Sequence, residues 1–472
     1  MKKEPVKVRE IAVEERVKSF SEVVLGYSEE EALLEAGRCL QCKNPTCISG
    51  CPVGIDIKKF IYQITQKDYE GAYLTIREKN NFPSICGRVC PAEYQCRKAC
   101  VLTKRGSLFA SDEAINIHFL ERFVGDWGMN NSSLKFKVKN SKFSAVKVAV
   151  VGSGPAGICC AGELARSGIK VTIYENLHKP GGVLRYGIPN FRLPQEILDR
   201  EISYLRDLGV KIITSFVVGR NKTLDELFKE GYSAIFLGLG AGVPSFLNIK
   251  GENLCNIYSA NEFLTRVNLM CAYKFPDYHT PINIGKKIVV IGGGNTAMDA
   301  ARVALRLQVM SGIEPDVTVF YRRREEEMPA RRLEIGHAKE EGVKFRFLVQ
   351  PKEFIPDERG FVKGMVCLEC KLGEFDQSGR PRPIPVAGSD FLVDADLVIV
   401  AIGLRANQLL TRVTPQLKIN NYGDIIVNPE TMETSIKNVF AGGDIVGGEG
   451  TVIEAMGMAK KASVAITNLF SS

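Results

Sequence analysis

The clearest pattern in the sequence is a pair of short apolar runs, each followed at once by glycines. One run is Lys147–Val151 and the other is Lys287–Ile291. Continuous apolar runs of this length are typical of strands buried on both faces of a parallel sheet, and helical sequence follows each glycine turn. Strands that alternate with helices predict an α/β architecture with helices packed on parallel sheets.

The first 130 residues have a different pattern, with apolar residues at intervals of three and four. This helical spacing is present over Ile57–Ile64 and Tyr69–Ile76, and Glu29–Ala36 is a good helix former. Residues 129–144 are rich in Asn, Ser and Lys, which favours an exposed linker. We therefore expect a mostly helical domain followed by an α/β region.

Length and charge indicate a protein of several domains without a nucleic-acid or membrane partner. A chain of 472 residues is too long for one core and should form several domains. The net charge is +8, and five lysines lie between residues 135 and 147. Without a recognition motif, this excess indicates a solvated linker or a docking face for an acidic redox partner, and we expect no nucleic-acid partner. Met1–Pro5 leads into charged sequence, and no apolar run reaches the roughly 18 residues of a membrane span, so we expect a cytoplasmic protein without a membrane partner.

Cysteine is concentrated near the amino terminus. Eight of the 14 cysteines lie between Cys39 and Cys100, and in a cytoplasmic protein this crowding favours metal over disulfides. In two-cluster ferredoxins the cysteine before a proline serves the other cluster. By that logic Cys39, Cys42 and Cys47 hold one iron–sulfur cluster, while Cys51, which precedes Pro52, crosses to a second. Structural zinc is the alternative, although the usual paired C-x2-C knuckles are absent.

The first glycine turn predicts an FAD site. It runs from Gly152 to Gly157, and the acid Glu175 ends the next strand, where it can accept hydrogen bonds from ribose hydroxyls. Near the end of the chain, Gly443 and Asp444 follow another short strand, at the edge where open α/β sheets bind ligands. The residues of the turn that we assign to FAD are Gly152, Gly154, Pro155, Ala156 and Gly157.

The second glycine turn predicts an NADP(H) site. Its second strand, Val317–Tyr321, ends in arginines and not in an acid. An acid there would repel the 2′-phosphate of NADP, whereas arginine can pair with it, so we expect NADP over NAD; the alternative is a solvated turn balanced by three glutamates. The residues assigned to NADP(H) are Gly292, Gly294, Asn295, Thr296, Asp299, Arg322 and Arg323.

The order of these motifs predicts one dinucleotide-binding domain inserted into another. The expected divisions are a helical domain (1–130), a linker (131–146), an FAD domain in two parts (147–283 and 404–472) and an NADP(H) domain (284–403). The fold class is thus α/β, with two nested Rossmann-like domains preceded by an α-helical domain that holds two [4Fe-4S] clusters.

Several other signals are discounted. Cys367 and Cys370 match the C-x-x-C of disulfide reductases, but Lys363–Leu372 has the character of a strand, on which residues three apart point to opposite faces. Cys159 and Cys160 fall in a helix, where free cysteine behaves as a small hydrophobe. Four scattered histidines favour neither a metal site nor a nucleophile motif.

Taken together, these motifs resemble the small (beta) subunit family of NADPH-dependent glutamate synthase. Relatives with the same pattern include the amino-terminal half of dihydropyrimidine dehydrogenase, the large subunit of the bifurcating NADH-dependent ferredoxin:NADP oxidoreductase, and sulfide dehydrogenase alpha subunits. The resemblance covers nearly the whole chain and is carried by Arg38–Cys42, Gly87–Pro91, Gly181–Pro189, Tyr321–Arg323 and Met328–Arg331.

The resemblance implies a ligand set for each cluster. It places one [4Fe-4S] cluster on Cys39, Cys42, Cys47 and Cys100, and the other on Cys51, Cys90, Cys96 and the carboxylate of Glu121, with Cys86 as a spare thiol. It also implies FAD contacts at Gly182, Arg185, Gly443, Asp444, Thr451 and Val452.

The function implied is electron transfer through FAD and iron–sulfur clusters. Hydride exchange between NADP(H) and FAD needs no protein acid or base, so no catalytic residue is expected. The expected partner is a second redox subunit, such as a glutamate synthase large subunit, or ferredoxin. The runner-up is the large subunit of the bifurcating oxidoreductase, which needs a small FAD/[2Fe-2S] subunit. A disulfide reductase and a zinc-bound interaction module are further alternatives.

Overall fold

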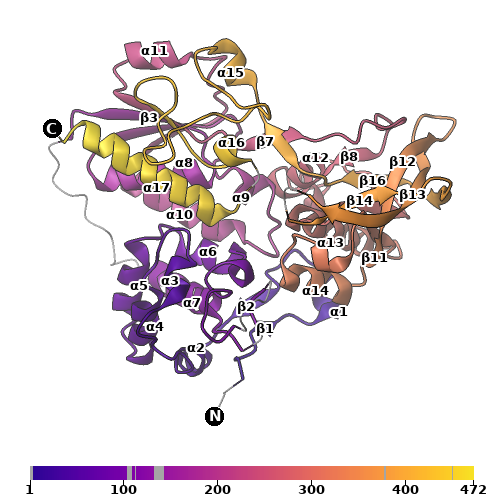
Figure 1. The fold of residues 1–472 in the computed structure, drawn as a ribbon, viewed down its shortest axis with the longest axis horizontal. Coiled ribbons are helices and arrows are strands. Elements are labelled where there is room, and N and C mark those ends of the chain that lie inside the picture. The colour runs from indigo at the N-terminus through magenta and orange to yellow at the C-terminus, as the bar shows by residue number, and fades with distance from the viewer. Residues whose placement is uncertain are drawn as a thin grey trace.

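The structure is a computed structural model that describes residues 4–103, 109–111, 113–131, 143–376, 379–448 and 450–471. It has three bodies: a helical domain below, a sheet with its helices at upper left, and a second sheet with its helices at right (Figure 1). Most of the predicted linker, residues 132–142, lies outside the described residues. None of the described helices combines the length and apolar character that crossing a bilayer requires.

The first body is the predicted helical domain. Asp56 and Asp68 cap two of its helices, each accepting a hydrogen bond from a backbone N–H of the first turn. The apolar faces meet in a core that contains Phe60, Ile64 and Leu120. Its elements are β1 (Arg9–Glu10), α1 (Val13–Arg16), β2 (Val24–Gly26), α2 (Glu29–Ala36), α3 (Thr46–Ser49), α4 (Ile57–Thr65), α5 (Tyr69–Arg77), α6 (Pro83–Val89), the 3-10 turn η1 (Ala92–Tyr94) and α7 (Ile117–Asn130).

The second body, which we call the FAD half, has a five-stranded parallel sheet in the order β18-β6-β3-β4-β5. Long helices α8, α10 and α17 pack on it (Figure 1). Its elements are β3 (Lys147–Val151), α8 (Pro155–Arg166), β4 (Lys170–Tyr174), α9 (Val183–Tyr186), α10 (Gln195–Asp207), β5 (Lys211–Ile213), α11 (Leu224–Lys229), β6 (Ala234–Leu237), α15 (Leu409–Val413), β18 (Val439–Ala441), α16 (Asp444–Gly447) and α17 (Val452–Leu469).

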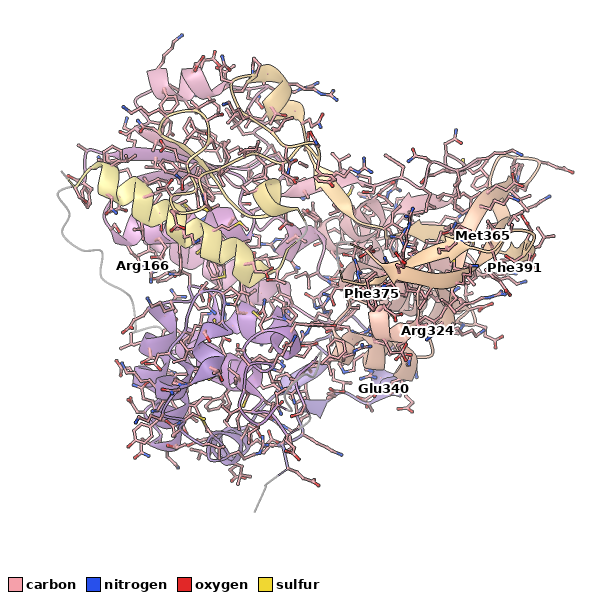
Figure 2. All side chains as sticks on the ribbon, viewed as in Figure 1. Arg166, Arg324, Glu340, Met365, Phe375 and Phe391 are labelled. Atoms are coloured by element: carbon pink, nitrogen blue, oxygen red, sulfur yellow. The ribbon has the colours of Figure 1, made fainter. Side chains whose placement is uncertain are left out.

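The third body, the nucleotide half, has a parallel sheet in the order β11-β10-β9-β16-β8 and an antiparallel sheet built on β12, β13, β14 and β15. Met365 and Phe391 mark the antiparallel sheet, far from the FAD half (Figure 2). Its elements are β8 (Ile257–Ser259), α12 (Ala260–Leu264), the π-helical turn η2 (Thr265–Leu269), η3 (Ala272–Lys274), β9 (Ile288–Ile291), α13 (Asn295–Met310), β10 (Val317–Tyr321), η4 (Glu325–Glu327), α14 (Arg332–Glu340), β11 (Lys344–Phe347), β12 (Val349–Pro356), β13 (Val362–Phe375), β14 (Pro381–Pro385), β15 (Phe391–Asp394) and β16 (Leu397–Val400).

An antiparallel ribbon joins the two halves. It pairs β7 (Ala241–Pro244), on which the chain leaves the FAD half, with β17 (Leu404–Ala406), on which it returns. The nested α/β fold is therefore confirmed. The sheet of the nucleotide half also includes β8, which pairs with β16 and precedes the expected division at residue 284. A strand of three residues carries too little periodicity to be assigned from sequence.

Candidate functional site

The first group of cysteines surrounds a single cavity in the helical domain. Cys39 and Cys42 follow α2, Cys47 lies on the short helix α3, and Cys100 comes from the segment before α7. All four line the cavity, whose remaining wall includes the apolar side chains of Ile57, Ile61, Ile115 and Ile117. The structure thus brings together the four predicted ligands of the first cluster.

The electrostatics of this cavity suit a cationic centre. Burial, together with the nearby thiols of Cys100, Cys39 and Cys42, raises the pKa of Cys47 to about 12. Burial also raises the pKa of Cys39. Acidic groups that crowd together without a cation resist ionisation, whereas a bound metal centre supplies the missing positive charge and deprotonates thiols. Four thiols in an apolar cavity therefore fit an iron–sulfur cluster.

The second group of ligands depends on close packing of α6 and α7. Cys90 caps the carboxyl end of α6, and Glu121 lies within α7. A Cβ on Gly87 would lie 2.6 Å from the backbone of Arg122, so glycine is what lets the two helices approach this closely. This contact brings Cys90 near Glu121.

Charge coupling links Cys51, Cys90, Cys96 and Glu121, and Cys86 shares in it, because its thiol interacts with Cys90, Glu121 and Cys51. Burial raises the pKa of Glu121 to about 8, and burial, together with the charges of Glu121 and Cys90, raises the pKa of Cys51 to about 11. Burial, followed by the charges of Cys51 and Glu121, raises the pKa of Cys96 well above its usual range. Three thiols and a carboxylate buried together also fit a cationic cluster.

Two residues around this second group, Asn80 and His118, carried no signal in the sequence, and Cys86 was predicted as a spare thiol. The Asn80 side-chain amide donates to Glu121 Oε1. His118 lies one turn before Glu121 on α7, and its buried Nδ1 has no hydrogen-bond partner within the described residues. Cys86 Sγ lies 3.6 Å from Asn80 Oδ1 and 3.7 Å from the sulfur of Met456 on α17. The predicted spare thiol therefore sits between the second group and the FAD half.

The glycine turn of the FAD half forms an open cradle at the start of α8. Gly152 has φ +99°, and a Cβ there would lie 2.3 Å from the Gly238 carbonyl oxygen. A Cβ on Gly154 would meet nothing within 4 Å, so the side of the turn that faces the helix start is open. Pro155, Ala156 and Gly157 form the first turn of α8, where the backbone N–H groups of Ala156 and Gly157 have no acceptor within the helix. A pyrophosphate fits such a cradle.

Glu175 lies where predicted, just after β4. Its buried carboxylate accepts hydrogen bonds from the Ser153 backbone at 2.9 Å and from the Leu177 backbone at 2.8 Å. Burial, together with the charges of Asp444 and Glu175, raises the pKa of Tyr186 to about 12. The charges of both predicted FAD acids therefore act on one half-buried tyrosine.

The remaining predicted FAD residues shape the same region. Gly182 approaches the glycine turn so closely that its Cβ would lie 2.6 Å from Gly154 Cα. A Cβ on Gly443 would likewise lie 3.2 Å from the Cβ of Ala156. Arg185 is buried, donates to the Pro180 carbonyl and pairs with Asp199, so it holds its own loop. Thr451 caps α17, directly before Val452, and accepts from Gln95 of the helical domain at 3.3 Å.

The second glycine turn opens in the same way at the start of α13. A Cβ on Gly292 would lie 2.2 Å from the Ala401 oxygen, whereas one on Gly294 would meet nothing within 4 Å. Thr296 is exposed in the first helical turn, and Asn295 Oδ1 accepts from the Arg331 backbone at 2.9 Å. Asp299 is buried and pairs with Arg192 of the FAD half at 2.6 Å. Asp299 is thus directed to the junction of the two halves.

The two predicted phosphate-binding arginines differ in availability. Arg323 is buried, donates to the Pro381 carbonyl at 2.8 Å and pairs with Asp376 at 2.6 Å. Arg322 is exposed and makes no hydrogen bond or ion pair within the described residues. Arg324 is also exposed (Figure 2). Arg322 is therefore the predicted arginine whose guanidinium is free for a phosphate.

A cleft of about 1310 Å³ opens beside the ribbon that joins the two halves. Its walls include Val243 on β7, Ser245 just after it, Leu404 and Arg405 on β17, and Gly448 after α16. The space is thus lined by the ribbon and by loops of the FAD half, and it is large enough for part of a dinucleotide.

Two family profiles cover most of the chain. Residues 16–133 match dihydropyrimidine dehydrogenase domain II, 4Fe-4S cluster, and residues 146–462 match pyridine nucleotide-disulphide oxidoreductase. The boundary between them falls in the segment predicted as a linker.

Relatives match over nearly the full length. The chain is 35% identical to the glutamate synthase [NADPH] small chain of Escherichia coli K12, over 99% of this chain and 96% of that protein. It is 34% identical to the Azospirillum brasilense small chain, over 94% of this chain and 90% of that protein. It is 36% identical to the NADPH-Fe(3+) oxidoreductase subunit beta of Geobacter sulfurreducens, over 96% and 68%.

Among solved structures, Mycobacterium tuberculosis FprA in complex with NADPH has a similar fold. The TM-score is 0.58 at 23% identity, over 69% of this chain and 84% of FprA. At this identity the likeness concerns the fold alone.

Proposed function

This chain belongs to the small (beta) subunit family of NADPH-dependent glutamate synthase, and we propose that it carries electrons between NADP(H) and a partner subunit through FAD and two iron–sulfur clusters. The family makes the chain an NADPH-dependent oxidoreductase with iron–sulfur and flavin cofactors. The number of clusters, the residues that hold each cofactor and the identity of the partner are our proposal.

One observation carries the proposal: the second ligand group lies directly against the FAD half. Cys86 Sγ is 3.7 Å from Met456 Sδ on α17, and Gln95 donates to Thr451 at the start of the same helix. A cluster on Cys51, Cys90, Cys96 and Glu121 would thus be separated by a single packed layer from the proposed FAD residues. This proximity favours electron transfer over a structural metal.

The protein residues bind and orient the cofactors. The α8 and α13 N-termini would hold the two pyrophosphates, Glu175 would accept from ribose hydroxyls, and Arg322 would pair with the 2′-phosphate of NADP(H). The chemistry supplied by the bound cofactors is hydride exchange between nicotinamide and flavin, and single-electron exchange through the clusters. The cleft beside the β7–β17 ribbon would receive the nicotinamide and limit its access to water.

The first group of ligands holds the cluster through which electrons would pass to the partner. Leu40 and Val101 line its cavity and are 62% and 50% exposed. Apolar side chains exposed beside a redox centre suit contact with another protein. The proposed partner is a glutamate synthase large subunit; a small FAD/[2Fe-2S] subunit, as in the bifurcating oxidoreductase, or ferredoxin is the alternative.

The test combines composition with spectroscopy. Purified protein should contain about eight iron and eight sulfide per FAD, and anaerobic NADPH should bleach the flavin absorbance and produce cluster EPR signals. Zinc in place of iron, or flavin reduction without reduction of any cluster, would contradict the proposal. Affinity purification from the native host separates the two partner classes, because a glutaminase-containing large subunit and a small FAD/[2Fe-2S] subunit differ greatly in mass.

A further inference from the structure

A short segment that follows η4 and ends on the first residue of α14, residues 328–332, touches both the second glycine turn and the segment 88–94 around Cys90; we call it the strap. Its nucleotide side is fixed by two hydrogen bonds. The Ala330 backbone N–H donates to the Gly293 carbonyl at 3.2 Å, and the Arg331 backbone N–H donates to Asn295 Oδ1 at 2.9 Å. Gly293 and Asn295 belong to the turn proposed to bind the nucleotide.

The opposite side of the strap contacts the loop that carries Cys90 and Cys96. The Tyr94 hydroxyl donates to the Ala330 carbonyl at 2.9 Å, and Tyr94 lies between those two cysteines in sequence. Arg331 Nη1 donates to the Arg88 carbonyl at 2.9 Å, and its Nε lies 3.5 Å from a carboxylate oxygen of Glu93. The contacts of Arg331 therefore lie on either side of Cys90.

Arg332 extends this connection to the loop of the three arginines. It donates to the carbonyls of Glu325 and Glu326 at 3.1 and 3.0 Å. Its guanidinium lies 4.2 Å from the centre of the Phe109 ring, which packs edge-on against Tyr94 at 5.2 Å. Tyr94 is thus contacted by Ala330 directly and by Arg332 through the Phe109 ring.

The two central residues of the strap are buried. Ala330 is fully buried and Arg331 is 2% exposed. A buried positive charge acts through a low dielectric, so a small shift of the Arg331 guanidinium changes the electrostatic potential at neighbouring groups far more than it would in water. Arg331 makes both contacts itself: its backbone N–H binds Asn295 on the nucleotide side, and its guanidinium binds the Arg88 carbonyl on the cluster side.

From these contacts we infer that the strap couples nucleotide binding to the electron affinity of the second cluster, with Arg331 and Tyr94 as positioning residues. The inference rests on the proposed function, which places the nucleotide and the cluster at the two sides. Such coupling is reciprocal: the factor by which the nucleotide binds one redox state better equals the factor by which it shifts the cluster's reduction equilibrium. Because the nucleotide and the added electron are both negative, we expect the nucleotide to lower the potential.

The test uses adenosine 2′,5′-bisphosphate, which carries the 2′-phosphate and one 5′-phosphate of NADP. It has no nicotinamide and so cannot exchange hydride. Its binding to the holoprotein is measured by calorimetry, and the second cluster is titrated by EPR with redox mediators, with and without the ligand. We expect the ligand to lower the potential by about 59 mV, the equivalent of a tenfold difference in Kd between redox states.

Tyr94→Phe removes one hydroxyl and no charge, so it separates the strap from through-space electrostatics. We expect it to reduce the ligand-induced shift to less than half, while the matched variant Tyr232→Phe, whose hydroxyl pairs with Tyr174 in the FAD half, keeps the full shift. A full shift in Tyr94→Phe overturns the inference. If Tyr94→Phe does not assemble its clusters, Arg331→Lys, which keeps the charge, takes its place with the same criterion.

Two further outcomes separate this inference from the proposed function. If the ligand binds the wild-type protein without moving the cluster potential, the strap does not couple the sites and the proposed function stands. If the ligand does not bind, or if no second cluster is present, the inference and the corresponding part of the proposed function both fail.

Discussion

Arg322 and Arg323 are adjacent in sequence but lie in opposite environments. Successive residues leave the end of a strand in opposite directions, so one guanidinium turns inward to Asp376 and the other faces solvent. Sequence position could indicate a phosphate site after β10, but the choice between the two arginines depends on Asp376, which is distant in the chain.

Arg322→Ala should weaken NADPH binding about 10- to 100-fold and change NADH binding less than about twofold. The reason is the loss of a charge-assisted hydrogen bond, worth about 1.5–3 kcal/mol, that NADH never forms. Binding of each nucleotide to the oxidised protein can be measured by fluorescence. Arg324→Ala, a neighbouring exposed arginine, is the control; equal losses for NADPH and NADH in Arg322→Ala would remove the phosphate role.

Glu121→Cys should leave the iron and sulfide content unchanged but shift the potential of one cluster by about 59 mV or more, or tenfold in its reduction equilibrium. A thiolate is a softer ligand than a carboxylate and alters the electron density at the cluster. EPR-monitored titration measures the shift. The control is Cys86→Ser, at the buried thiol beside Met456, which should retain all iron. Loss of a cluster in Cys86→Ser, or an unchanged potential in Glu121→Cys, would make Cys86 the ligand and Glu121 the spare residue.

At the scale of elements, the contact between α6 and α7 brings the second ligand group together. Periodicity predicted helices over Ile57–Ile64 and Tyr69–Ile76 but not at α6 or α7, and it could not show that Gly87 lies against the backbone of Arg122. That closeness is a property of two helices distant in sequence. The same packing produces the Asn80 bond to Glu121 and leaves Nδ1 of His118 without a hydrogen-bond partner among the described residues.

Gly87→Ala should therefore destabilise the protein by about 1–3 kcal/mol, because the new methyl group meets backbone atoms at 2.6 Å and the helices must separate. The second cluster should be lost before the first. Thermal unfolding and iron analysis report the two effects.

The matched control is Gly336→Ala in α14, where a Cβ meets nothing within 4 Å. It should raise stability by up to about 1 kcal/mol through helix propensity. Similar destabilisation in both variants would show that the α6–α7 contact is not the cause.

At the scale of the whole molecule, buried ion pairs join the two halves. Arg192 of the FAD half pairs with Asp299 at 2.6 Å and with Glu334 at 3.0 Å, both in the nucleotide half. Arg302 also pairs with Glu334 and with Glu341. The predicted nucleotide residue Asp299 thus serves the junction in this structure, since its buried carboxylate faces an arginine from another domain.

Arg192→Met should lower the free energy of unfolding by about 3–5 kcal/mol, because it leaves buried acids without part of their positive charge. Hydrogen exchange should increase at the start of α13 and in α14. The exposed Arg359 is the control, and Arg359→Ala should change stability by less than about 0.5 kcal/mol. An unchanged melting temperature in Arg192→Met would show that the pair does not hold the two halves.

The amino-acid sequence alone determined the local units of this protein: cysteine spacing, two strand–glycine–helix turns, the acid after β4 and the arginines after β10. These depend on residues within about 30 positions of one another, where chain geometry limits the outcome. Only the tertiary structure decided which side chains are free to bind a cofactor, because Arg323 pairs with Asp376 and Asp299 pairs with Arg192. It also decided that Glu121, on α7, lies near Cys90. Burial and pairing depend on segments that meet only after folding.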